Sequence, residues 1–126
     1  MFTPVQPGDE VPIYRQIVNQ VREGVAAGSF PLGHKLPSHR DLAALLAVAP
    51  LTVKKAYDEL EAQGLIETRR GLGSFIRETP AAPAPDEVRE RLARAARRLL
   101  TEARLAGVPL DRVEQLLREL DASDPS

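Results

Sequence analysis

Basic side chains and small residues that let a backbone approach a ligand stand together in one part of this sequence. Arg69 and Arg70 come directly before Gly71 and Gly73 in the segment RRGLG. Two guanidinium groups beside two glycines suit contact with a phosphate or a minor groove, because glycine has no side chain to hold the backbone away. The chemistry that this segment indicates is the binding of a nucleic acid.

Two short helices joined by a tight turn are expected before this basic segment. Ser38, followed three residues later by Asp41, is a variant of the capping box that opens a helix. Pro50 can end that helix and open the next one, which covers about residues 50–63 and ends at Gly64. Because the turn is short, the helices must cross steeply, and the second projects by its N-terminal end. The residues expected in the core are Leu42, Leu45 and Leu46 on the first helix and Val53, Ala56, Tyr57 and Leu60 on the second.

A further helix is expected before this pair, and a β-hairpin after it. Pro12 suits the first turn of a helix that ends at Gly28, and apolar residues recur along it at four-residue intervals. A strand over residues 65–70 is expected to turn and return over 74–77, with the basic segment at its tip. The expected core residues of the helix and the loop after it are Ile13, Tyr14, Ile17, Val18, Val21, Val25, Phe30 and Leu32.

This order of elements is that of a winged helix-turn-helix, and its residues resemble a known family. The segments LPSxRxLA and TVxxAYxxLExxGLIExRRGxGSFI look like the winged-helix domain of the GntR family of bacterial transcription regulators, over about residues 11–78. The resemblance implies that the second helix of the pair is a recognition helix and that the wing, residues 69–73, enters the minor groove. With their neighbours, the candidate DNA-contact residues are Ser38, His39, Arg40, Ala49, Pro50, Leu51, Thr52, Lys54, Lys55, Arg69, Arg70, Gly71 and Gly73.

The turn before the recognition helix departs from the family pattern. It is polar in most members, whereas Ala49, Pro50 and Leu51 stand there in this chain. Leu51 cannot donate a hydrogen bond to a base. Sequence readout is therefore expected to use methyl contacts with thymine, together with Thr52 and Lys54.

The rest of the chain reads as a linker and two helices. Residues 79–85, TPAAPAP, are expected to form a semi-rigid linker between a DNA-binding domain over 1–78 and a tail over 86–126. The tail carries apolar residues at helical spacing, with one helix ending at Gly107 and a last helix over 110–121. Two short helices cannot bury this surface alone, so a second copy of the chain is the simplest partner. The residues expected in the dimer interface are Val88, Leu92, Ala95, Leu99, Ala103, Val113, Leu116, Leu117 and Leu120.

The brief tail also points to one branch of the family. It is too short for the larger effector domains of other GntR branches, and it is similar to the YtrA branch, whose C-terminal helices form the dimer. Those members commonly begin the last helix with a serine after a glycine, whereas Val108 and Pro109 stand there in this chain. A small-molecule effector, if one binds, would have to bind near the linker or between the tail helices.

Composition limits the remaining classes of protein. Lys and Arg number 17 against 18 Asp and Glu, so the placement of charge, and not its total, must support a DNA-binding interpretation. The absence of cysteine excludes disulfides, thiol catalysis and cysteine-based zinc sites. No stretch is apolar for long enough to span a membrane. We expect a cytoplasmic protein that associates with the nucleoid through DNA.

No catalytic or metal-binding set stands out, so no enzyme activity and no cofactor are expected. The chain lacks a glycine-rich phosphate loop and a serine, histidine and carboxylate set that suggests a triad. His34 and His39 lie five residues apart, and a phosphate contact by His39 is favoured over a metal site. The expected function is a homodimeric transcriptional repressor that binds an inverted-repeat operator. The alternative is a winged-helix protein-interaction module, which would show no salt-dependent affinity for DNA.

Overall fold

The computed structural model describes residues 2–79 and 84–123, which form two compact units over these ranges. The middle of the linker expected over 79–85 lies outside the described residues. Pro85, predicted to belong to that linker, is instead the first residue of a helix.

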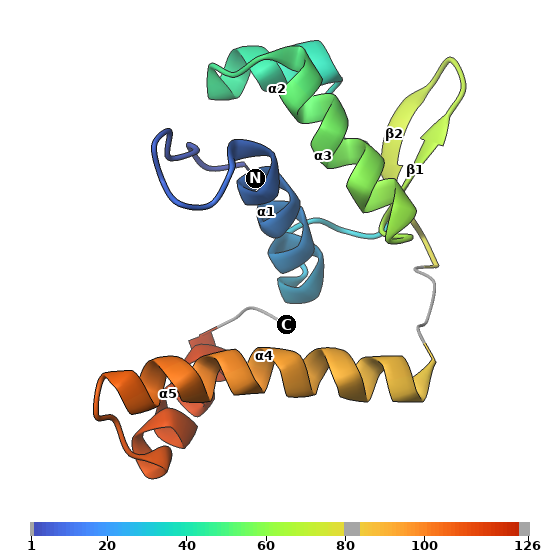
Figure 1. Cartoon of the computed structure of the whole chain (residues 1–126). Coiled ribbons are helices and arrows are strands. Elements are labelled where there is room, and N and C mark those ends of the chain that lie inside the picture. The colour runs from blue at the N-terminus through green and yellow to red at the C-terminus, as the bar shows by residue number, and fades with distance from the viewer. Residues whose placement is uncertain (1, 80–83, 124–126) are drawn as a thin grey trace. The chain divides into compact units, whose positions relative to one another are not determined.

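Five helices and a two-stranded hairpin follow one another along the chain (Figure 1). The fold is therefore mainly helical with a small β-hairpin, as the sequence predicts. Among the described residues, no helix is long and apolar enough to cross a membrane. The elements are α1 (Ile13–Ala27), α2 (His39–Leu46), α3 (Pro50–Ala62), β1 (Ile66–Arg69), β2 (Gly73–Ile76), α4 (Pro85–Leu105) and α5 (Leu110–Ser123).

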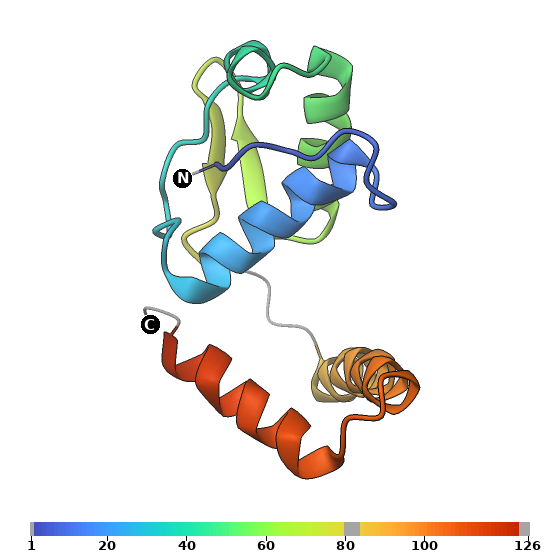
Figure 2. The ribbon, with the colours of Figure 1, turned by 90° about the vertical axis from the view of Figure 1, so that its left-hand side faces the viewer.

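In the first unit, α3 is the central element, because it packs against α1, α2 and β1 (Figures 1 and 2). The hairpin is antiparallel and pairs Ile66 with Ile76 and Arg69 with Gly73. The segment before α2 extends this small sheet: Leu36 N–H donates to Ser74 O over 2.8 Å. The wing is thus tied to the chain that enters the helix pair.

Local signals begin α2 and end α1 where the sequence predicts. Ser38 Oγ accepts a hydrogen bond of 3.1 Å from Asp41 N–H and caps α2. Gly28 takes the left-handed conformation after α1. Ala47, at the end of α2, is also left-handed, with φ of 57°, and is the one residue other than glycine with positive φ in the described part of the chain.

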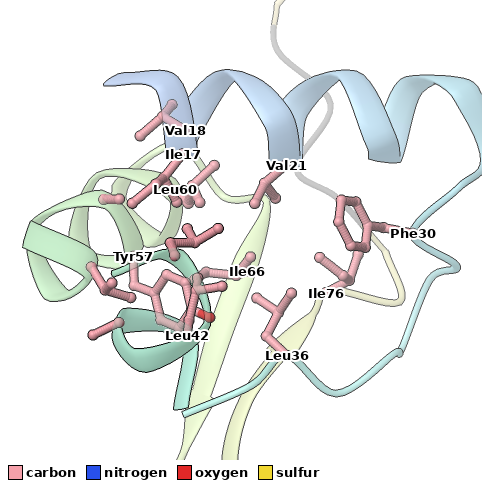
Figure 3. Packing of buried hydrophobic residues seen from close by; sticks show 14 of the residues in the cluster. Ile17, Val18, Val21, Phe30, Leu36, Leu42, Tyr57, Leu60, Ile66 and Ile76 are labelled. Carbon is pink, nitrogen blue, oxygen red and sulfur yellow. The ribbon is translucent and has the colours of Figure 1, made fainter. Parts of the chain in front are cut away.

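The core of the first unit is closed by apolar side chains from every one of its elements (Figure 3). Ile17 and Leu60 are fully buried where α1 meets α3. Tyr57 is buried too, and its hydroxyl donates to Pro37 O over 2.7 Å. Burial raises the pKa of Tyr57 above its ordinary value, so the phenol stays a neutral donor. The prediction that Tyr57 belongs to the core is confirmed.

Two predicted core residues are exposed, and those predictions are wrong. The buried face of α2 runs through Leu42, Ala43 and Leu46. Leu45 lies roughly 110° around the helix from the centre of that face and is 65% exposed. Leu32 is 55% exposed, in the surface loop before α2. Phe30, predicted alongside Leu32, is buried as expected.

The N-terminal segment is held along α1 by two glutamine side chains. Gln20 accepts from Thr3 N–H over 2.8 Å and donates to Thr3 O over 2.9 Å. Gln16 makes the same pair of bonds with Gln6, over 2.7 and 3.0 Å. The two glutamines are one helical turn apart, so they pair with the segment much as a neighbouring strand would. Val5, between the two contacts, is buried.

In the second unit, α4 and α5 meet at the turn around Gly107, whose φ of 71° allows the chain to reverse. Ala103 and Val113 are buried there. Apart from these two residues, the apolar face expected in the dimer is largely open to solvent in the single chain. Its large exposed side chains include Val88, Leu92, Leu116, Leu117 and Leu120, and Leu105, Val108 and Leu110 are exposed beside them.

Candidate nucleic-acid interface

The N-terminal end of α3 presents an apolar side chain to solvent. Ala49 caps the helix through its backbone, because its carbonyl accepts from Thr52 N–H over 3.0 Å. Pro50 is the first helical residue, and Leu51, which follows it, is 77% exposed. The first N–H groups of a helix carry a partial positive charge, which favours a nearby phosphate. This end therefore combines an anion-attracting backbone with an exposed leucine.

The two lysines of α3 have different surroundings. Lys54 Nζ lies 2.7 Å from Asp58 Oδ2, and both side chains are more than half exposed. Such a surface pair contributes little and can be exchanged for a phosphate. Lys55 instead lies over the ring of Tyr14, with Nζ 3.9 Å from the ring centroid. Lys55 and Tyr14 line a shallow groove with Ile13, Leu51 and Thr52.

The tip of the wing is a tight turn, and its two arginines have different surroundings. Leu72 N–H donates to Arg69 O over 2.9 Å, and Gly71 has the φ of 79° that a type II turn requires at its third position. Arg69 lies along the hairpin: its guanidinium is 2.7 Å from Glu67 Oε1 and 4.4 Å from the centroid of the Phe75 ring. Arg70 is exposed at the tip.

A second groove runs between the wing and the start of α2. Ser38 and His39 line one side, and residues 68–74 of the wing line the other. Lys35 also lines it, and sequence reasoning missed this residue. Lys35 lies across Gly73, where an added Cβ would stand 3.1 Å from Lys35 Cε. The only sequence signal was a basic residue just before the capped helix; its place beside the wing depends on the pairing of this segment with β2.

The structure thus places the predicted contact residues around two grooves on the first unit. Leu51, Thr52 and Lys55 line the groove beside α1, and Ser38, His39 and the wing residues line the other. The remaining polar candidates, Arg40 and Lys54, are exposed on α2 and α3. In the described part of the chain, no group of three His, Asp or Glu side chains could hold a metal ion.

Three helices with a short α2–α3 turn, followed by a hairpin with a basic tip, make a winged helix-turn-helix of the DNA-binding class. Residues 13–76 match the description "Bacterial regulatory proteins, gntR family". The chain belongs to the GntR family.

The relatives agree with this assignment over nearly the full chain. The HTH-type transcriptional repressor YtrA of Bacillus subtilis (strain 168) is 36% identical over 118 residues, which are 94% of this chain and 91% of that protein. A crystal structure described as a transcriptional antiterminator from Listeria monocytogenes EGD-e has a TM-score of 0.82 at 34% identity, covering 96% of this chain and 90% of that one. The resemblance to the YtrA branch is confirmed.

A third neighbour was solved on DNA. The DNA-binding domain of AraR in complex with operator ORR3 has a TM-score of 0.51 at 25% identity, covering 60% of this chain and 92% of that one. The fold, the family and these relatives make the protein a DNA-binding transcription regulator.

Proposed function

We propose that this protein is a homodimeric transcriptional repressor of the cytoplasm that binds an inverted-repeat operator, without catalytic activity. Two observations together carry the proposal. The first unit presents the candidate DNA-contact surface, called here the reading edge, and the second unit presents an uncovered apolar face. Dimers of helix-turn-helix proteins place two recognition helices in successive major grooves, about 34 Å apart. The Bacillus subtilis relative is named a repressor, which supports repression of transcription as the function proposed here.

The reading edge is assigned to the first unit, with α3 in the major groove and the wing in the minor groove. Leu51, Thr52 and Lys54 are proposed to meet base edges. Arg70 is proposed to bind at the wing, because it is exposed while Arg69 is already paired with Glu67. The phosphate contacts are assigned to the residues at the start of α2, the α2–α3 turn and the wing backbone, namely Ser38, His39, Arg40, Ala49, Pro50, Lys55, Gly71 and Gly73.

The dimer contact is assigned to the tail, residues 86–126, with residues 1–78 as the DNA-binding domain. Leu92 is 65% exposed and lines a shallow apolar groove along α4 with Val88 and Ala96. An exposed apolar face that extends over two helices favours association with the same face of a second copy, as in a symmetric dimer. Ala95 and Leu99 continue the same face of α4.

The test is the salt dependence of DNA binding by the full chain and by Arg70→Gln. The probe is a duplex selected by the wild type from a random pool. We expect the logarithm of affinity to fall steeply with the logarithm of salt concentration, and Arg70→Gln to flatten that slope by about 0.9 for each phosphate that the variant no longer neutralises. The matched control is Arg22→Gln, on the C-terminal half of α1. Absence of any selected, salt-dependent complex would favour the protein-interaction module instead.

A further inference from the structure

Lys55 is held over an aromatic ring where the first turn of α1 approaches the N-terminal half of α3. Its Nζ lies 3.9 Å from the centroid of the Tyr14 ring. The two residues come from different helices, which pack against each other through the core. They line one groove with Leu51 and Thr52. The Lys55 ammonium therefore stands on the same side of α3 as two proposed base-reading residues.

Lys55 differs from its cationic neighbours in its partner, because no carboxylate pairs with it among the described residues. Lys54 pairs with Asp58 at 2.7 Å, and Arg15 pairs with Glu59 at 2.8 Å. An aromatic ring attracts a cation through its quadrupole and leaves the net charge in place. Lys55 is thus held over the Tyr14 ring, and its charge is not offset by a paired carboxylate among the described residues.

We propose that Tyr14 is a positioning residue, which holds the Lys55 ammonium at the N-terminal edge of α3 so that Lys55 contacts a phosphate beside the base pairs that α3 reads. The inference rests on the proposed function and makes the first turn of α1 part of the DNA-binding surface. A lysine that is restricted before binding loses less conformational freedom on DNA. The helix N-terminus adds to the attraction for the phosphate.

The experiment compares Lys55→Gln, Tyr14→Leu, their double variant and Tyr14→Phe in the full chain. Affinity for the selected duplex is measured by fluorescence anisotropy over a range of KCl concentrations. We expect Lys55→Gln to flatten the salt slope by about 0.9 for one phosphate left without its lysine, or about twice that for a symmetric dimer. Tyr14→Leu should weaken binding, and the double variant should bind no more weakly than Lys55→Gln. Tyr14→Phe keeps the ring and should bind like the wild type.

Two controls separate positioning from other effects. Arg22→Gln removes one positive charge about 12 Å further along α1 than Tyr14, at 1.5 Å per helical residue, and should leave the slope unchanged. Thermal melting of each variant checks the fold, and Tyr14→Met replaces Tyr14→Leu if the latter unfolds. A wild-type slope for Lys55→Gln, additive losses in the double variant, or a loss in Tyr14→Phe would overturn the inference. A wild type without a sequence-specific complex would instead contradict the proposed function.

Discussion

Leu51 is the residue whose exposure most needs a functional reason, since exposing a large apolar side chain at the start of a helix does not stabilise the fold. It is 77% exposed. The group on a base edge that an aliphatic side chain can recognise is the C5 methyl of thymine. The exposure of Leu51 therefore supports the expectation from the sequence that this protein reads part of its operator through methyl contacts.

We expect Leu51→Asn to change the preferred operator and to leave thermal stability near that of the wild type, because the side chain buries little surface. Selection from a random pool with both proteins, followed by sequencing, measures the preference. Replacing operator thymines by deoxyuridine, which lacks the methyl, should weaken wild-type binding by about 0.8 kcal/mol per methyl contact and should spare Leu51→Asn. An unchanged preferred sequence would show that this end of α3 is wrongly assigned.

Gly24 tests packing at a single residue of α1. Alanine in place of glycine inside a helix ordinarily stabilises by about 1 kcal/mol. Here the added Cβ would stand 2.0 Å from Phe30 Cδ2, so the buried ring would have to move. Because overpacking costs about 1–3 kcal/mol, we expect Gly24→Ala to lower the free energy of unfolding in urea. The control Asn19→Ala, at an exposed position of α1, should raise it slightly; a gain for Gly24→Ala would contradict the packing.

Among the elements, the α2–α3 turn carries a measurable conformational cost. Ala47 has φ of 57° and ψ of 48°. The left-handed region costs a residue with a Cβ about 1–2 kcal/mol. Glycine avoids this cost, but it destabilises the folded state by about 0.5–1 kcal/mol because its unfolded chain has more conformational entropy. We expect Ala47→Gly to raise the free energy of unfolding by about 0.5–1 kcal/mol. Ala44→Gly, on the exposed face of α2, should lower it by about 1 kcal/mol. Equal losses in both variants would contradict the role of the turn.

Elements with local signals could be predicted from the sequence, because the groups that decide them are close in the chain. The cap at Ser38 is completed by Asp41 N–H three residues later, and Gly107 supplies its own positive φ. Which arc of a helix is buried depends on distant neighbours, and this is why Leu45 was misplaced on α2. The overall order of helices, hairpin and tail could be predicted because glycine and proline mark the helix ends and the turns.

The candidate site was predictable in its residue types and not in its contacts. The basic tip of the wing is visible in the sequence, but the pairing of Arg69 with Glu67 and Phe75 needs the hairpin register. The placement of Lys55 on Tyr14 joins residues of two helices far apart in the chain. Such partners decide which of the basic side chains remain free for DNA, and only the folded structure supplies them.

For the whole molecule, association through the tail should decide both oligomeric state and affinity. Leu92→Asp puts a charge in the exposed apolar groove of α4 and should yield a folded monomer in sedimentation velocity. Loss of the second reading edge should weaken operator binding by about 10²-fold or more. Arg94→Asp, about 200° around α4 from Leu92, should remain dimeric. A dimer in Leu92→Asp would show that the tail face is not the interface.

The most direct test of sequence-specific binding by a dimer is a comparison of two duplexes at physiological salt. One duplex is selected by the wild-type protein from a random pool, and the other has the same bases in scrambled order. We expect two chains per selected duplex and an affinity about 10³-fold or more above that for the scrambled one. Equal affinity for the two duplexes would contradict sequence-specific binding by this protein.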